Sequence, residues 1–93
     1  MNQQPEHEHK QTRAVVNRLS RIEGHIRSIK AMVEEERDCA DVLIQLSAVR
    51  AAIDKVGRVV LEDHLESSLF QAGVLPEDSD VWAGVKEALD VYL

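Results

Sequence analysis

The sequence is poor in the residues that cross-link a chain or break its regular structure. Its 93 residues include one cysteine, two prolines, four glycines and three aromatic side chains. A single cysteine excludes an internal disulfide and favours a reducing compartment, so we expect a cytoplasmic protein. Because so few aromatic side chains give a chain of this length only a thin core, we expect a second copy to cover part of its apolar surface.

Long apolar runs are also missing. No stretch approaches the roughly 18 apolar residues of a membrane-spanning helix, and the opening residues, MNQQPEHEHK, lack the apolar centre of a signal peptide. We therefore expect no membrane partner. The sequence also has no glycine-rich phosphate loop, no CxxC pair and no serine–histidine–acid set, so we do not expect an enzyme.

The most regular stretch runs from Asp38 to Ser68 without a proline. Its apolar residues recur at alternating steps of three and four, which predicts one long helix with a single apolar seam. The seam residues are Cys39, Val42, Leu46, Val49, Ile53, Val56 and Val60. Asp38 is a suitable N-cap for this helix, which places Cys39 in its first turn.

Two further helices are predicted on either side of this stretch. Residues 10–35 repeat the three-and-four spacing, through Val15, Leu19, Ile22, Ile26, Ile29 and Val33, and the short connection predicts an antiparallel hairpin. Gly73 and Pro76 end the long helix, and residues 81–92 form a short third one. We predict an all-α protein with a single domain over residues 1–93, in which residues 1–9 are a flexible lead-in.

Charge is unevenly distributed along the chain. The net charge is −6, which alone argues against nucleic-acid binding. However, residues 10–30 carry six basic side chains and one acidic one, a net +5, whereas residues 61–93 carry eight acidic side chains and one basic one, a net −7. A basic first helix on an acidic body is compatible with binding to phosphates through one face.

Cys39 and His64 occupy opposite ends of the long helix. They are 25 residues apart, about 37 Å at about 1.5 Å per residue, so one helix cannot bring them together. The midpoint falls at Ala51 and Ala52, where small side chains would let two copies of the helix cross closely. An antiparallel two-fold crossing would place Cys39 of one chain near His64 of the other, twice per dimer. From its position alone, Cys39 is equally compatible with the role of a small buried apolar residue.

Three segments in order carry a resemblance to a known family. They are NRLSRIEGHIRSIKAMVEEERDC, VLIQLSAVRAAIDKV and VLEDHLESS, and together they resemble the CsoR/RcnR family of bacterial transcriptional repressors. The resemblance implies a three-helix protomer, an antiparallel dimer that forms a four-helix bundle, and dimers that pair into a disc-like tetramer. It also implies binding to operator DNA without a helix-turn-helix, relieved by an inducer that is commonly a metal ion.

The resemblance assigns an inducer site to Cys39, with His64 supplied by the partner chain. Copper(I) sensors of the family have a second cysteine where this sequence has Ser68, and a third-helix carboxylate at a position that aligns with Gly84. Nickel and cobalt sensors use an N-terminal histidine, which matches His7. Two imidazoles and one thiolate suit nickel, cobalt or zinc better than copper(I).

Three other kinds of protein are also compatible with these residues: an electrophile sensor, a helical metal-binding protein and a coiled-coil adaptor. Formaldehyde-sensing members of the family also keep the cysteine and histidine without the second cysteine, and use an N-terminal proline amine, which Pro5 does not provide. An electrophile sensor acting through Cys39 would need no metal. A helical metal-binding protein, or a coiled-coil adaptor, would have no role on DNA.

The family's DNA contacts map onto Arg18 of the first helix and Lys55 of the second. Arg13 and Arg21 would widen this basic surface. Contacts of this kind are made to phosphates, so they position the protein and make its affinity salt-dependent.

Overall fold

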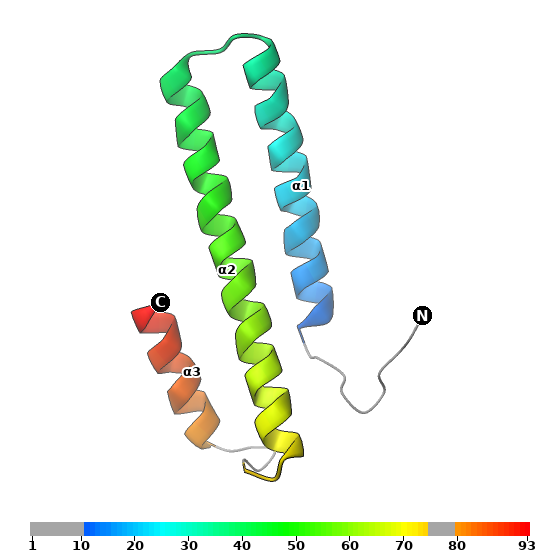
Figure 1. The fold of residues 1–93 in the computed structure, drawn as a ribbon, viewed down its shortest axis with the longest axis vertical. Coiled ribbons are helices and arrows are strands. Elements are labelled where there is room, and N and C mark those ends of the chain that lie inside the picture. The colour runs from blue at the N-terminus through cyan, green and yellow to red at the C-terminus, as the bar shows by residue number, and fades with distance from the viewer. Residues whose placement is uncertain (1–10, 75–79) are drawn as a thin grey trace. The chain divides into compact units, whose positions relative to one another are not determined.

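The computed structural model describes residues 11–74 and 80–93, which form three α-helices (Figure 1). They are α1 (Thr12–Glu34), α2 (Cys39–Gln71) and α3 (Asp80–Tyr92). These residues contain no β-strand, so the predicted all-α class is confirmed. The predicted flexible lead-in lies outside the described residues. None of the helices in the described ranges is long and apolar enough to cross a membrane.

The chain divides into two compact units that share the long helix. One unit is residues 12–57, and the other contains Gln11 and the described part of residues 58–93. Helix α2 is assigned as one uninterrupted helix through both. The single domain over residues 1–93 stays a prediction.

In the first unit, α1 and the first part of α2 form the predicted antiparallel hairpin, joined by four residues (Figure 1). Glu36 ends the turn after α1 with a left-handed backbone at φ 56°. The amide of Arg37 donates to the carbonyl of Met32 at 2.9 Å, which satisfies one of the last carbonyls of the helix. Asp38 then caps α2, because its Oδ2 accepts a hydrogen bond from the amide of Ala40 at 3.1 Å. The predicted cap is confirmed.

The hairpin core is aliphatic and narrow. Four buried side chains form it, with three partly buried ones packed around them: Ile22, Ile29, Val49 and Val56, then Val15, Val42 and Ala52. On α1 the aliphatic members recur every seven residues, and the valines of α2 do the same. Each helix therefore presents one narrow line of side chains to the other.

Within one chain, the hairpin buries only part of the apolar seam predicted for each helix: three of its six positions on α1 and four of its seven on α2 are exposed. Leu19 and Ile26 of α1 are 47% and 43% exposed, and Leu46 and Ile53 of α2 are 46% and 49% exposed. Cys39 is exposed as well. A three-and-four seam is wider than one partner helix covers, so the hairpin buries one edge of each seam and leaves the other uncovered.

The second unit is built from the end of α2 and from α3. Trp82 of α3 is 7% exposed, and Glu62 of α2 is 5% exposed. Arg58 Nε lies 3.5 Å from Asp90 Oδ1, which ties the two helices together. Gly73 ends α2 with φ 77°, and the amide of Val74 donates to the carbonyl of Leu69 at 3.0 Å, as in a Schellman motif.

Candidate metal site and basic surface

Cys39 is the first residue of α2 and is exposed and without a disulfide. The capping carboxylate of Asp38 sets the start of the helix immediately before it. Cysteine sulfur binds metal ions and attacks electrophiles, and both kinds of chemistry need an accessible side chain. The structure thus places the predicted sensing thiol where solvent and ligands reach it.

His64 lies near the other end of α2 and is also exposed. Its neighbour Asp63 accepts a hydrogen bond at Oδ2 from the amide of Gln11, at 3.4 Å. This bond ties the start of the described chain to the turn of α2 that carries His64. His7, the third predicted ligand, lies outside the described residues, four positions before Gln11.

No metal site is complete within the described part of one chain. In residues 11–74 and 80–93, no three histidine, cysteine, aspartate or glutamate side chains are grouped so that they could hold a metal ion. Ser68, one turn after His64, is exposed. Gly84 of α3 is exposed as well, and a Cβ built there would meet nothing within 4 Å.

An exposed line of residues links the two candidate ligands along α2. It begins at Cys39 and continues at steps of four and three: Leu43, Leu46, Arg50, Ile53, Gly57, Val60 and His64. We call these eight residues the exposed stripe. Its large apolar members are 46–58% exposed, a high value for leucine, isoleucine and valine.

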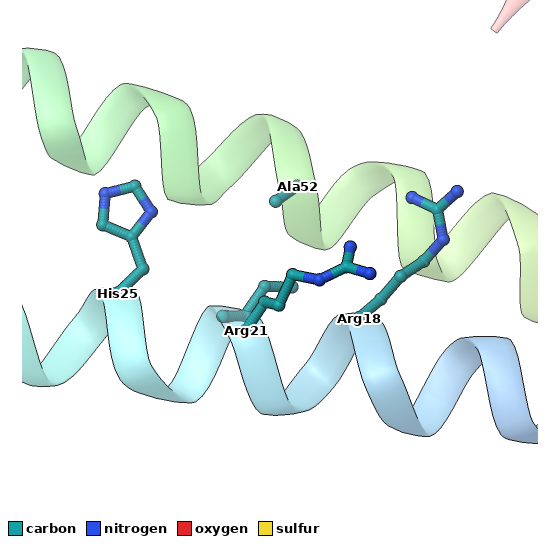
Figure 2. A pocket seen from close by; sticks show the side chains of 5 residues that line it. Arg18, Arg21, His25 and Ala52 are labelled. Atoms are coloured by element: carbon teal, nitrogen blue, oxygen red, sulfur yellow. The ribbon is translucent and has the colours of Figure 1, made fainter.

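A basic pocket lies between α1 and α2 of the hairpin (Figure 2). Its volume is about 150 Å³, and it is lined by Arg18, Arg21, Ile22, His25 and Ala52. In Figure 2 the two arginines and the histidine rise from α1 on the side that faces Ala52 of α2. The structure therefore brings two of the predicted DNA contacts together in one pocket.

The other predicted basic contacts do not line this pocket. Arg13 is exposed near the start of α1, and Lys55 is half-buried on α2. His25, which is not among the residues predicted from the sequence to contact DNA or metal, lies with its Nε2 2.7 Å from Gln45 Oε1 of the facing helix. The signal for this role was available, because His25 falls three residues after Ile22 and four before Ile29 on the buried line of α1.

A buried acidic group joins α2 to α3. Burial raises the pKa of Glu62, and a hydrogen bond to the nearby carboxylate of Asp90 raises it further, whereas the positive charges of Lys86 and Arg58 act in the opposite direction. Among the residues that the structure describes, none gives Glu62 Oε2 a hydrogen-bond partner. The arrangement favours the protonated, neutral form of Glu62.

Sequence comparison connects this arrangement to known repressors. The chain is 42% identical over 78 residues to the copper-sensing transcriptional repressor CsoR of Bacillus subtilis, which covers 84% of this chain and 74% of the relative. It is 38% identical over 78 residues to the repressor of the same name in Mycobacterium tuberculosis, where the match covers 84% of this chain and 63% of the longer relative. These relatives are repressors rather than enzymes.

Structural comparison leads to the same group. The nickel-responsive transcriptional regulator InrS is 46% identical and superposes with a TM-score of 0.65, over 94% of this chain and 98% of that one. The family model described as metal-sensitive transcriptional repressor matches residues 11–92, nearly the whole sequence. The chain therefore belongs to the CsoR/RcnR family of metal-sensitive transcriptional repressors.

Proposed function

We propose that this protein represses transcription by binding operator DNA, and that a divalent transition metal releases it. The metal would be held by Cys39 of one protomer and His64 of its partner in an antiparallel homodimer. The observation that carries the proposal is the exposed stripe, which has these two residues at its ends. Each candidate ligand is exposed in its own chain and faces the surface that a partner would cover.

The spacing of the stripe is symmetric about the point between Ala51 and Ala52. If two copies cross antiparallel at that point, Cys39 pairs with His64 of the partner subunit, and Leu43 and Leu46 pair with the partner positions equivalent to Val60 and Gly57. Twenty-five residues correspond to about seven turns at 3.6 residues per turn. An isologous contact of this kind contains two equivalent sites. We also propose that such dimers pair into a tetramer, as the resemblance to the family implies.

The donor atoms favour a borderline divalent ion. A thiolate and an imidazole suit nickel, cobalt and zinc, whereas copper(I) prefers sites richer in sulfur. Ser68 adds no sulfur one turn after His64. The similarity to nickel-responsive InrS supports this choice, although several relatives are named as copper sensors. His7 is the proposed third ligand.

DNA binding is assigned to the basic residues of the hairpin. Arg18 and Arg21 line one pocket, and Lys55 and Arg13 would extend the contact along α2 and α1. A dimer or tetramer repeats this basic surface, so the part of the protein that faces the DNA is positively charged although the chain as a whole is negative. Each phosphate contact releases counterions, so affinity should fall steeply with salt.

The two activities are coupled through α2. Cys39, a proposed metal ligand, and Lys55, a proposed DNA contact, both lie on this helix. Holding Cys39 and the partner's His64 together fixes the angle at which the two copies of α2 cross, and this angle sets the spacing between the basic surfaces. Coupling of about 1–3 kcal/mol, which is typical of allosteric proteins, would lower DNA affinity by about 5- to 150-fold.

A mobility-shift titration tests the proposal with reduced, metal-free protein and DNA from its own promoter. Nickel, cobalt or zinc should release the DNA at lower free concentrations than copper(I) does. Ser68→Cys should shift this preference towards copper(I), because it adds a second thiolate. The repressor assignment fails if the wild-type protein shows no salt-sensitive binding. The metal assignment fails if only formaldehyde releases the DNA.

A further inference from the structure

The buried line of α1 contains two polar side chains among its aliphatic ones. Its positions, at steps of three and four, are Val15, Arg18, Ile22, His25 and Ile29. A polar group next to an aliphatic core destabilises the fold unless it finds a partner. Arg18 and His25 are half-buried here. Their polar groups therefore indicate that this part of the hairpin has a role in binding as well as in packing.

Gln45 provides the partner for one side of the His25 ring. Its Oε1 lies 2.7 Å from Nε2, and an amide oxygen only accepts, so Nε2 donates in this arrangement. Rotating the amide by half a turn would present its NH₂ group, and then Nε2 would accept while Nδ1 carried the proton. Gln45 therefore fixes the ring in both tautomers.

The other ring nitrogen is on the pocket side. Figure 2 shows Nδ1 on the edge of the ring that faces Arg21 and Ala52. The side chain of Arg21 runs along α1 towards Arg18. Two guanidinium groups and one imidazole therefore border the same pocket, together with the apolar side chains of Ile22 and Ala52.

The size and charge of the pocket fit one tetrahedral oxyanion. The volume of about 150 Å³ is several times the roughly 10–15 Å³ that one water molecule needs on the same measure, which leaves room for a phosphate group. Among the described residues that line the pocket, none is a carboxylate. Guanidinium groups bind phosphate oxygens through paired N–H donors. When Gln45 turns its NH₂ group towards Nε2, Nδ1 carries the ring proton and would add a third donor from another direction.

We propose that Arg18, Arg21 and His25 form a seat for a single phosphate group, with Gln45 as the residue that positions the imidazole. The inference rests on the proposed DNA binding, because the operator backbone is the expected source of that phosphate. In this proposal His25 contacts a phosphate group. The contact fixes the position of the basic surface along the DNA duplex. Free inorganic phosphate shares the same chemistry and should occupy the same seat weakly.

The variants Arg21→Gln, His25→Ala and Gln45→Leu test the seat, with Arg27→Gln as the matched control. Arg27 is exposed on α1 and does not line the pocket. Operator affinity of the full-length protein is measured over a range of salt concentrations. Loss of a charge-assisted contact should weaken binding about tenfold for Arg21→Gln, with a salt dependence reduced by about one phosphate per protomer.

His25→Ala should also weaken operator binding, and Gln45→Leu should weaken it less while leaving the salt dependence unchanged. In a second arm without DNA, inorganic phosphate is titrated against chloride at constant ionic strength, and the imidazole resonances of His25 are followed by NMR. They should shift in the wild-type protein and in Arg27→Gln, and shift much less in Arg21→Gln.

The outcomes separate the inference from the function on which it rests. If the wild-type protein does not bind its operator, the proposed function fails. If it binds, and Arg21→Gln and His25→Ala bind as tightly as Arg27→Gln, the seat does not exist. Weaker DNA binding without any response to free phosphate would assign the seat to the DNA backbone alone. Arg21 is exposed, so its substitution leaves the core intact and keeps the test decisive if His25→Ala does not fold.

Discussion

Nε2 of His25 on α1 lies 2.7 Å from Oε1 of Gln45 on α2, beside the aliphatic core of the hairpin. This contact fixes the relative position of the two helices more specifically than aliphatic packing does, because a hydrogen bond has a required distance and direction. It also holds the imidazole at the edge of the basic pocket. The same pair thus contributes to the stability of the hairpin and to the geometry of its basic surface.

Replacing one member of this pair should destabilise the protein more than replacing both. Gln45→Leu leaves the ring nitrogen half-buried without its partner and should lower the free energy of unfolding by about 1–2 kcal/mol. The double variant His25→Leu/Gln45→Leu should recover most of that loss, because two apolar side chains can pack together. Chemical denaturation of both variants measures the difference, and Ser47→Leu, at an exposed position of α2, is the control. Additive losses would show that the pair is not coupled.

The exposed stripe of α2 should be the dimer interface. Leu46 is 46% exposed in the single chain. A charged side chain at this position would be buried in the dimer interface without an opposite charge to pair with. We expect Leu46→Glu to dissociate the oligomer at micromolar concentration, with a loss of about 3 kcal/mol or more in association free energy. Sedimentation velocity measures the change.

Ser47→Glu places the same charge one residue away and should leave the oligomer intact. Ser47 is exposed and outside the stripe, so the two variants have the same net charge and differ in the face of α2 that is charged. A monomeric wild-type protein, or equal behaviour of the two variants, would contradict the proposed interface.

Stability should depend on pH through Glu62. Burial, followed by the hydrogen bond to Asp90, raises the pKa of this carboxyl above its ordinary value near 4.5. The folded protein therefore binds the proton more tightly than the unfolded chain does. The resulting stability is fully present below pH 4.5, is lost as the pH rises through the folded pKa, and does not change further above it.

Glu62→Gln should remove this decline, because the amide keeps a donor for Asp90 and carries no charge. The free energy of unfolding of the metal-free protein, measured between pH 4 and pH 8, should fall less for the variant than for the wild type. Glu87→Gln changes an exposed carboxyl of α3 and serves as the control. A variant that declines as steeply as the wild type would exclude Glu62 as the source.

The helices and their ends could be predicted from local signals. Asp38 caps α2 as its side chain and position indicated, and Gly73 ends α2 because a left-handed residue was needed there. Such signals depend on a few neighbouring residues, so the sequence alone contains them. The positions of Cys39 and His64 on one helix followed from the same periodicity.

The division of each seam into a buried and an exposed edge could not be predicted in this way. Leu46 and Val49 are equally apolar, yet only Val49 is buried, because α1 covers one edge of α2 and leaves the other. Periodicity indicates that a face is apolar but not which partner covers it. His25 was missed for the related reason that a histidine on an aliphatic line looks like a surface residue until Gln45 is seen opposite it.

The claim that the metal site is shared between two chains is tested most directly by mixing two defective variants. Cys39→Ala and His64→Ala each lack one ligand, and neither homodimer should show thiolate-to-metal charge-transfer absorption with nickel or cobalt. After subunit exchange, each mixed dimer should contain one site with both ligands, so the absorption should return to about a quarter of the wild-type value. Two results would contradict a site built from Cys39 of one protomer and His64 of its partner. One is a mixture that shows no charge-transfer absorption, and the other is a His64→Ala protein that absorbs like the wild type.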